Sequence, residues 1–415
     1  MELNSKQTGG QAFRPARRMD GVSESATLRL NALVQKLRAQ GEDIVNLTTG
    51  EPDFAVPQAA KEAAIDAILK DRSKYTPAAG IPELREKIAA RTNAQQPGLA
   101  KSRPWKSSDI TVTNGAKQAI FNALLALVDD DDSVLIPAPY WLSYPEMAKL
   151  AGGRPRILET RFDEGFVLKA DVLREGLRNA AASGSRPRIL FLNSPSNPTG
   201  GMMAREDFAK LGEVIRSEPA ARDLWVISDE IYDRVSYDRV PFVSFLEACP
   251  ELRDQVITVN GLSKAAAMTG WRVGWSVAPE SVQPALVTLQ GQSTSGINSV
   301  AQWASLAALD LPEAAFADQI RQYRERRDLV LEILRQSVKL KVFPPLGAFY
   351  AWVDISGARA DGEDSFQFAE RLLKDGKVAV VPGTPFGGPD AFRISFATDL
   401  STLRKACERI VKFVG

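Results

Sequence analysis

The sequence predicts an α/β protein that has a mostly parallel central sheet with helices on both faces, plus a smaller α+β domain. Continuous apolar runs, such as residues 224–228 and 256–259, are typical of buried parallel strands. Helical patterns separate these runs, and 415 residues exceed the usual span of a single hydrophobic core. We therefore expect residues 57–310 to form the larger domain, and residues 21–56 together with 311–415 to form the smaller one.

Composition and charge exclude several classes of function. A net charge of +1 gives no reason to expect a nucleic-acid or membrane partner, and no apolar run is long enough to cross a bilayer. The two cysteines, Cys249 and Cys407, are too few for a disulfide framework or a thiolate zinc site, which favours a reducing, cytoplasmic location. Because histidine is absent, imidazole bases and His-ligated metals are excluded. We expect small-molecule partners, no metal, and proton transfer by lysine.

The N-terminal region is expected to contain an arm, one helix and one strand. Residues 1–20 are polar, and we expect them to form a mobile extension. Apolar residues recur at helical spacing over residues 23–40, which predicts a helix that Gly41 ends. Residues 44–47 read as a short strand before the turn-forming cluster at 50–54.

Two helices and a loop follow this cluster. Residues 57–69 have a helical pattern, and Pro82 at a first-turn position opens a second helix that continues to residue 91. The loop between the two helices is rich in helix breakers and presents one aromatic hydroxyl, that of Tyr75. A loop tyrosine more often packs against its neighbours than binds a ligand.

A strand, a glycine turn and a helix N-terminus then form a candidate anion site. β-branched residues predict a strand at 109–113, and the turn at Gly115 and Ala116 leads into an apolar helix. Free backbone N–H groups and the helix dipole favour a phosphate at such a turn. The dipole disfavours a cation in the first turn, so Lys117 suggests an offsetting anion, although a tolerated surface lysine explains it equally well.

Two further strands deliver large polar or aromatic side chains to loops. The strand at 134–137 leads to Trp141, whose flat indole either covers the core or stacks on a planar ligand. The strand at 188–193 leads to Asn197, which precedes a proline and is therefore held extended with its amide free to donate. An ordinary turn would explain the same composition.

The buried strand at 224–228 is followed at once by Asp229. In open α/β sheets, ligands bind at the carboxyl ends of the strands. Asp229 is therefore expected either to cap a helix or to pair with a cationic group of a ligand. Tyr232, three residues later, is expected on the same helical face.

Residues 261–274 read GLSKAAAMTGWRVG. Lys264 follows the strand at 256–259 and stands beside alanines, so we expect a desolvated amine able to form a Schiff base with an aldehyde cofactor. Arg272 is placed to hold a phosphate. Taken alone, this stretch is equally consistent with a strand, a short helix and a second strand that carry two solvated cations.

Long helical patterns after residue 279 lead into the C-terminal region. Strands are expected at 347–353 and 378–383, and a closing helix at 399–413. Arg393 lies within an alternating stretch, residues 392–396, that makes one strand face mostly apolar. A charged residue in such a pattern is usually exposed on the opposite face.

The pattern at 261–274 resembles the lysine signature of the class I aminotransferases, pyridoxal 5'-phosphate enzymes of fold type I. The likeness extends from about residue 27 to the C-terminus and includes the Asn-Pro-Thr-Gly motif that begins at Asn197. It implies that Lys264 carries the cofactor and that Ser263 and Arg272 contact its phosphate.

The same resemblance implies how the cofactor ring is held. Asp229 would pair with the protonated pyridine nitrogen and Trp141 would stack on the ring. Asn197 and Tyr232 would bind the phenolic oxygen. The histidine that supports the ring-nitrogen aspartate in some members is missing, so another group or a water must support Asp229.

The resemblance also implies a substrate clamp and a dimer. The guanidinium fork of Arg393, helped by Asn197 and the backbone of Gly50, would hold the substrate α-carboxylate. Tyr75 would reach the cofactor phosphate of the neighbouring subunit, so a homodimer is expected.

Resemblance to a bacterial subgroup implies which substrates are used. In that subgroup a lysine matching Lys117 and a threonine matching Thr27 receive the distal carboxylate of the substrate. The best-known members use an arginine of the partner chain instead, but no charged residue occurs between Glu280 and Asp310. Aspartate and glutamate are therefore the expected amino donors, with prephenate or aromatic oxo acids as the alternative.

These implications together predict ping-pong transamination between amino acids and 2-oxo acids. Lys264 would move a proton at the substrate α-carbon, and a second oxo acid would reverse the sequence. A lyase of the same fold would share Lys264, Asp229 and Arg393. A non-enzymatic regulator is the other alternative, but an arm of about 20 residues is too short for a DNA-binding domain.

Overall fold

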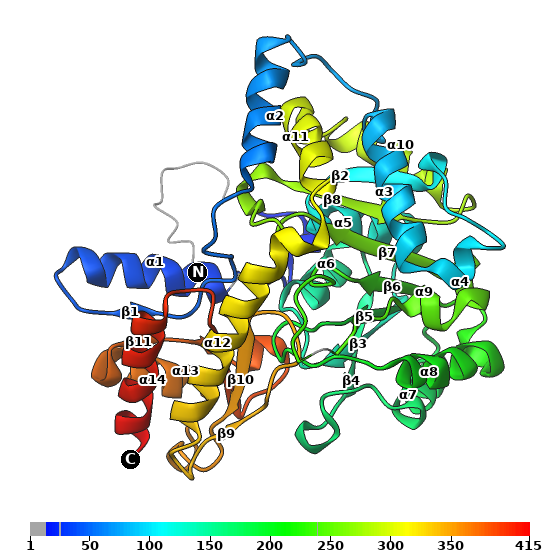
Figure 1. Cartoon of the computed structure of the whole chain (residues 1–415). Coiled ribbons are helices and arrows are strands. Elements are labelled where there is room, and N and C mark those ends of the chain that lie inside the picture. Colours follow the sequence, from blue (N-terminus) through cyan, green and yellow to red (C-terminus); the bar gives the residue numbers. More distant parts are fainter. Residues whose placement is uncertain (1–13, 25, 239) are drawn as a thin grey trace, which may run out of the picture.

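The computed structural model describes residues 14–24, 26–238 and 240–415 (Figure 1). These ranges form an α/β body and a smaller α+β body, which confirms the predicted fold class. Residues 1–13 of the expected arm lie outside the described residues. Residues 14–20 are exposed and contain a 3-10 helix at Arg17–Met19.

The larger body is built on a seven-stranded sheet among the described residues. Strand β8 runs antiparallel to both of its neighbours, and the remaining pairs are parallel. In spatial order the strands are β2 (Ile110–Asn114), β8 (Val273–Val277), β7 (Val256–Gly261), β6 (Trp225–Asp229), β5 (Pro187–Asn193), β3 (Ser133–Ala138) and β4 (Arg154–Glu159).

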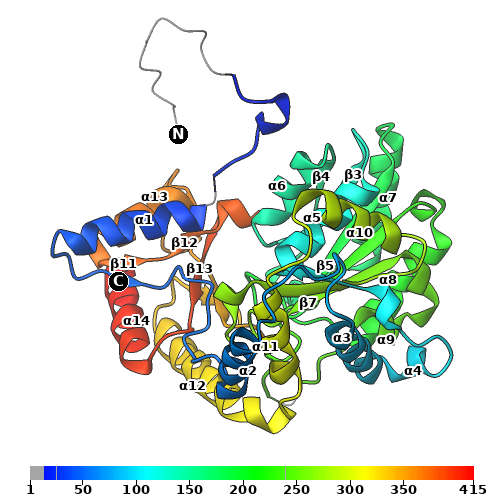
Figure 2. The same cartoon turned by 90° about the horizontal axis from the view of Figure 1, so that it is seen from above.

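Helices bury both faces of this sheet (Figure 2), which explains why its strands are continuously apolar. One face packs against α5 (Ala116–Leu127), α6 (Ser143–Leu150) and α10 (Gln283–Ser293). The other packs against α3 (Pro82–Gln95), α4 (Pro97–Ala100), α7 (Ala170–Ala182), α8 (Arg205–Ser217), α9 (Phe245–Ala248) and α11 (Ser299–Leu309), and α2 (Gln58–Leu69) lies on α11.

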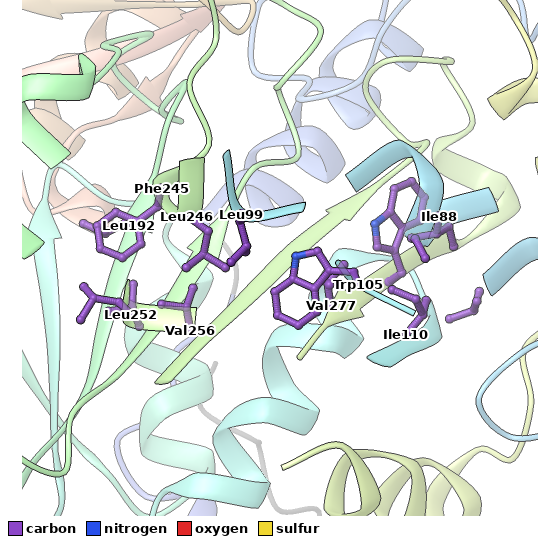
Figure 3. Packing of buried hydrophobic residues seen from close by; sticks show 14 of the residues in the cluster. Ile88, Leu99, Trp105, Ile110, Leu192, Phe245, Leu246, Leu252, Val256 and Val277 are labelled. Atoms are coloured by element: carbon purple, nitrogen blue, oxygen red, sulfur yellow. The ribbon is translucent and has the colours of Figure 1, made fainter. Parts of the chain in front are cut away.

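The core between the sheet and the second helical layer contains large side chains that are almost fully buried. Figure 3 shows Trp105 close to Ile88 and Ile110, and Leu252 close to Val256. Each apolar side chain buried in this way stabilises the fold by roughly 1.5–3 kcal/mol. This packing fixes the strands, so the residues at their carboxyl ends are held on a rigid frame.

The smaller body joins the two ends of the chain. Its core combines residues 45 and 47 and apolar residues from 323 to 414 with four residues of the segment that follows β6, at positions 231, 232, 235 and 237. A four-stranded sheet has the order β12-β13-β10-β9, and β1 pairs with β11 in a separate parallel pair. The elements are α1 (Ala26–Ala39), β1 (Val45–Asn46), α12 (Ala317–Leu334), β9 (Lys341–Val342), β10 (Tyr350–Asp354), α13 (Ser365–Arg371), β11 (Val378–Ala379), β12 (Val381–Pro382), β13 (Ala391–Ser395) and α14 (Leu400–Val414).

Two local expectations are wrong. The single strand predicted at 378–383 is two strands, because β11 pairs with β1 while β12, after Val380, pairs with β13. The segment after Asp229 is a series of turns over residues 231–234, not a helix, so Asp229 caps no helix and Tyr232 shares no helical face with it. In the first case tertiary pairing replaces the local periodicity. In the second, local turn bonds from Asp233 to Glu230 and from Val235 to Tyr232 form instead of a helix.

No helix in the three described ranges has both the length and the apolar composition needed to cross a membrane.

Candidate active site

A pocket of about 500 Å³ opens at the carboxyl edge of the seven-stranded sheet, where the two bodies meet. It brings together candidate residues from distant parts of the chain. Those that line it are Thr27, Gly50, Ala116, Lys117, Trp141, Asn197, Asp229, Tyr232, Ser263, Lys264, Arg272 and Arg393.

Lys264 lies just beyond β7 and points its amine across the pocket. Its Nζ donates a hydrogen bond of 2.6 Å to the carbonyl oxygen of Gly50. Desolvation, and next the positive charge of Arg393, lower the pKa of Lys264 to about 8. A fraction of the amine is therefore uncharged near neutral pH, as a nucleophile or base requires.

Asp229 is the last residue of β6 and is held by two donors. The hydroxyl of Tyr144 donates to its Oδ2 at 2.7 Å, and the backbone N–H of Ile231 donates to its Oδ1 at 3.3 Å. Burial raises the pKa of Asp229 to about 6, while these bonds oppose that rise. Tyr144 therefore occupies the supporting position that sequence reasoning left open, and its ring stacks on Phe191 at 4.3 Å.

The turn before α5 forms a tight cradle. Gly115 has a φ of +81°, and a Cβ on it would lie 2.6 Å from Nη2 of Arg272. A Cβ on Gly274 would lie 2.3 Å from the backbone nitrogen of Ala116. Backbone therefore approaches backbone closely here, and the guanidinium of Arg272 lies beside the turn that begins α5. This is the arrangement that binds phosphate at helix N-termini.

Two cations complete the cradle. Arg272, at a φ of +57°, donates to the carbonyl oxygens of Thr269 at 2.9 Å and Asn114 at 3.1 Å, which fixes its guanidinium. Desolvation and the charge of Arg272 lower the pKa of Lys117. The Nζ of Lys117 lies 4.9 Å from the centroid of the Trp141 ring. Mutual repulsion of two cations in one cradle is relieved by a bound anion.

Arg393 is buried, with 2% of its surface exposed, so the usual interpretation of a charged residue in an alternating strand, exposure on the opposite face, does not apply to it. Its charge is accommodated by polar and aromatic partners: Nη1 donates to Oδ1 of Asn197 at 3.0 Å and Nη2 donates to the carbonyl of Thr48 at 2.8 Å. The guanidinium carbon also lies 4.4 Å from the Tyr350 ring centroid. Among the described residues the hydrogen-bond partners of Arg393 are Asn197 and Thr48, and no carboxylate pairs with it. A buried cation without a carboxylate suits an anionic ligand.

The remaining candidates fall inside and outside the pocket. The hydroxyl oxygen of Tyr232 lies 2.9 Å from that of Tyr350. Tyr75 does not line the pocket of its own chain, and its side chain is 99% exposed.

Sequence reasoning missed three residues that shape the site: Tyr144, Asn193 and Tyr350. Asn193 ends β5, donates to the carbonyl of Asp229 at 2.9 Å and accepts from the N–H of Asn197 at 2.9 Å. Its place at a strand end was a usable signal. Tyr350 lies in an apolar stretch, where a tyrosine reads simply as core, and nothing in the sequence around Tyr144 indicates its contact with Asp229.

Comparison with known proteins identifies the family. Residues 42–410 match the family described as aminotransferase class I and II. The chain belongs to this family. It is 41% identical over 403 residues to the aspartate/prephenate aminotransferase of Thermus thermophilus, covering 96% of this chain and 98% of that protein.

Solved structures agree with this assignment. The aspartate aminotransferase of Thermus thermophilus with maleate matches with a TM-score of 0.88 and 39% identity, covering 97% of this chain and all of that one. The enzyme from Rhizobium meliloti matches with a TM-score of 0.90 and 35% identity, covering 97% and 99%. The fold is therefore fold type I, and the protein is a pyridoxal 5'-phosphate-dependent aminotransferase.

The residues present fit this cofactor. The pocket offers a desolvated amine for the aldehyde, a buried carboxylate for the ring nitrogen, an indole face for the ring and a glycine cradle with cations for the phosphate. This donor set meets each functional group of pyridoxal phosphate with its chemical complement.

Proposed function

We propose that this aminotransferase moves the α-amino group of aspartate or glutamate to a 2-oxo acid by a ping-pong mechanism. The observation that carries the proposal is Arg393, a buried guanidinium that lacks a carboxylate partner among the described residues and lines the same pocket as Lys264 and Lys117. Two separated cationic groups beside one reactive amine suit a substrate that has two carboxylates.

Arg393 and Asn197 would hold the α-carboxylate. Asn197 is fixed because its N–H donates to Asn193 and its Oδ1 accepts from Arg393, so its amide Nδ2 remains available to a ligand. Gly50 would contribute its backbone to the same clamp. A Cβ on Gly50 would lie only 3.0 Å from the Tyr350 hydroxyl oxygen, so the space beside this backbone suits a glycine. This clamp fixes which bond of the substrate faces the cofactor ring, and orientation of that kind contributes strongly to rate.

Lys264 would move the proton at the substrate α-carbon. Pyridoxal phosphate, when bound, supplies an electron sink for the negative charge that develops there. Asp229 would pair with the ring nitrogen, and Tyr232 and Asn197 with the phenolic oxygen. Ser263, Arg272, Lys117 and the turn at Gly115 and Ala116 would bind the phosphate, with Trp141 against the ring.

The distal carboxylate would be received by Lys117 and Thr27, which line the pocket. Prephenate or an aromatic oxo acid is the second candidate substrate. The relative from Thermus thermophilus, named for both aspartate and prephenate, favours it, as does a pocket of about 500 Å³, which has room for a ring.

We extend the proposal to assembly and location. The protein would act as a homodimer in the cytoplasm, with Tyr75 reaching the neighbouring site; its almost complete exposure in one chain supports this. Residues 57–310 would be the large domain, and residues 21–56 and 311–415 the small one. The shared core of residues 45 and 47 with the C-terminal region supports that division.

Initial rates over a panel of amino donors and oxo acids test the proposal. Aspartate and glutamate should give the highest kcat/KM, and oxo acid should form without release of ammonia, which a lyase acting by deamination would produce. Lys117→Ala should abolish the preference for dicarboxylates, whereas Lys149→Ala, which removes a lysine paired with Glu146 on α6, should keep it. An unchanged preference in Lys117→Ala would refute the distal-site assignment.

A further inference from the structure

Helix α1 presents a second polar side chain to the pocket one turn after Thr27. Asn31 follows Thr27 by four residues, so the two lie on the same face of the helix, and both line the pocket. Asn31 is part-buried rather than solvated. Sequence reasoning gave it no role.

Hydrogen bonds to the backbone determine which end of the Asn31 amide faces its neighbours. The N–H of Thr48 can only donate, and it donates to Asn46 at 3.0 Å, so the accepting atom of Asn46 is Oδ1. The other end of Asn46 is then the NH₂ group, which donates to Asn31 at 3.0 Å. The accepting atom of Asn31 is therefore its oxygen. The Thr48 hydroxyl lies 2.6 Å from this oxygen and 2.7 Å from Oδ1 of Asn46, and its single proton is donated to one of the two.

This arrangement leaves the NH₂ group of Asn31 as a donor. Both recorded bonds of Asn31 go to Oδ1, and none of the described residues accepts from Nδ2. An amide donor that lines a ligand pocket and lacks a protein acceptor is available to an oxygen atom of the ligand.

The same network ties Asn31 to the α-carboxylate clamp. Thr48, which is fully buried, accepts from Nη2 of Arg393 through its carbonyl oxygen at 2.8 Å. A continuous chain of hydrogen bonds thus runs from Arg393 through Thr48 and Asn46 to Asn31. The donor on α1 is therefore held at a fixed separation from the group that holds the other end of the substrate.

We propose that Asn31 is a specificity-determining residue whose Nδ2 donates a hydrogen bond to the distal oxygen of a dicarboxylate substrate. This inference rests on the proposed function and deepens it, because it adds a neutral, directional donor to the charge of Lys117. A site built to bond a polar group rejects an analogue that lacks the group, since the buried donor is then left unpaired.

Asn31→Asp tests the loss of the donor together with the addition of a negative charge in its place. Aspartate keeps the oxygen that accepts from Asn46 and Thr48 but replaces the NH₂ group with a second oxygen. The probes are maleate and its monocarboxylate analogue isocrotonate, with binding to the cofactor-loaded protein measured by calorimetry. We expect the Kd of maleate to rise by roughly tenfold or more, and that of isocrotonate to change by less than about threefold. Gln40→Glu, which adds the same charge at an exposed residue just past the end of α1, should change neither.

Asn31→Ala provides a second test if the aspartate variant does not fold or hold the cofactor. It removes the donor without adding charge, and the Kd of maleate should rise by roughly five- to tenfold while that of isocrotonate stays unchanged. Equal weakening of both probes would make Asn31 a structural residue and overturn the proposal, as would no weakening of either. If wild-type protein bound maleate no more tightly than isocrotonate, the dicarboxylate function itself would fail, which is a different result.

Discussion

The hydroxyl of Tyr144 donates a 2.7 Å hydrogen bond to Oδ2 of Asp229, and both side chains are buried beneath the proposed cofactor site. Burial alone favours the protonated carboxyl, whereas a donor favours the carboxylate. Because the chain contains no histidine, a neutral hydroxyl performs this task. The hydroxyl can only be a donor to a charged Asp229, so it supports the ionised form that a pyridinium nitrogen needs.

Tyr144→Phe should therefore raise the pKa of Asp229 above its value of about 6. Less of the carboxylate is then ionised at neutral pH, and affinity for pyridoxal phosphate falls. The affinity of the cofactor-free protein for the cofactor is measured as a function of pH. The midpoint of its loss at acidic pH should move upward by roughly one pH unit. The control is Tyr140→Phe, since within the described ranges the side chain of Asp229 accepts hydrogen bonds from Tyr144 and Ile231 and not from Tyr140. An unchanged acidic limb in Tyr144→Phe would contradict the assignment.

Asp229→Asn should change how the stability of the cofactor-free protein depends on pH. Asp229 has a folded-state pKa of about 6, above the ordinary value of 3.8, so the folded protein binds the proton more tightly than the unfolded chain. This group therefore costs no stability below about pH 4, and its destabilisation, on the order of 3 kcal/mol, develops as the pH rises through about 6.

The variant lacks that titration. The free energy of unfolding of Asp229→Asn minus that of wild type should therefore be larger at pH 8 than at pH 4.5, which means that the variant is relatively more stable at pH 8. Denaturant unfolding at the two pH values measures this difference directly. If the difference in free energy of unfolding between variant and wild type did not depend on pH, burial of the Asp229 carboxylate would not destabilise the folded protein.

Strand ends and turns could be predicted from the sequence, whereas contacts between distant segments of the chain could not. Asp229, Asn197 and Lys264 each follow an apolar strand, and the rule that ligands gather at carboxyl strand ends places them together. The turn at Gly115 could be predicted from the glycine that separates a strand from a helix. These signals are local, so a single sequence contains them.

Contacts between segments far apart in the chain had no such signal. Arg393 reads as an exposed strand residue, yet Asn197 and Thr48, 196 and 345 residues away, supply its partners. Strand pairing likewise divided the predicted strand at 378–383, because β1 takes one half and β13 the other. Periodicity describes which face of an element is apolar, but not what covers it.

Arg326→Ala should destabilise the loop that places Gly50. Both terminal nitrogens of Arg326, on α12, donate to the carboxylate of Asp53, at 2.7 and 2.9 Å, and the guanidinium lies 5.0 Å from the Phe54 ring centroid. Arg326 is buried while the carboxylate is one-third exposed, so we expect a loss of about 2 kcal/mol in the free energy of unfolding. Arg321→Ala, an exposed ion-pair variant on the same helix, should leave stability nearly unchanged. Equal effects from both would contradict a specific role for the Asp53 pair.

Two arginine-to-lysine variants should separate substrate binding from cofactor binding. Arg393→Lys loses the planar fork, so kcat/KM for aspartate should fall by roughly 100-fold or more, mainly through KM. Its affinity for pyridoxal phosphate should stay within a few fold of wild type. Arg272→Lys should show the reverse, with weaker cofactor binding and a nearly unchanged KM once the cofactor is saturating. Steady-state kinetics and cofactor titration of both variants would reveal any exchange of roles.

Mixing two inactive variants should restore activity if Tyr75 serves the neighbouring subunit. Tyr75→Ala would lack a phosphate ligand in trans, and Lys264→Ala would lack the reactive amine in its own chain. In a mixed dimer, one site has both defects, but the other combines an intact Lys264 with the partner's intact Tyr75. After refolding of an equal mixture, about half of the dimers are mixed and one site in each of them is intact. Activity should therefore reach about a quarter of the wild-type value. If the activity of the mixture stayed at the average of the two separate variants, Tyr75 would not serve the neighbouring site. As a control, mixed dimers are purified through a different tag on each variant, which ensures that the two chains have exchanged.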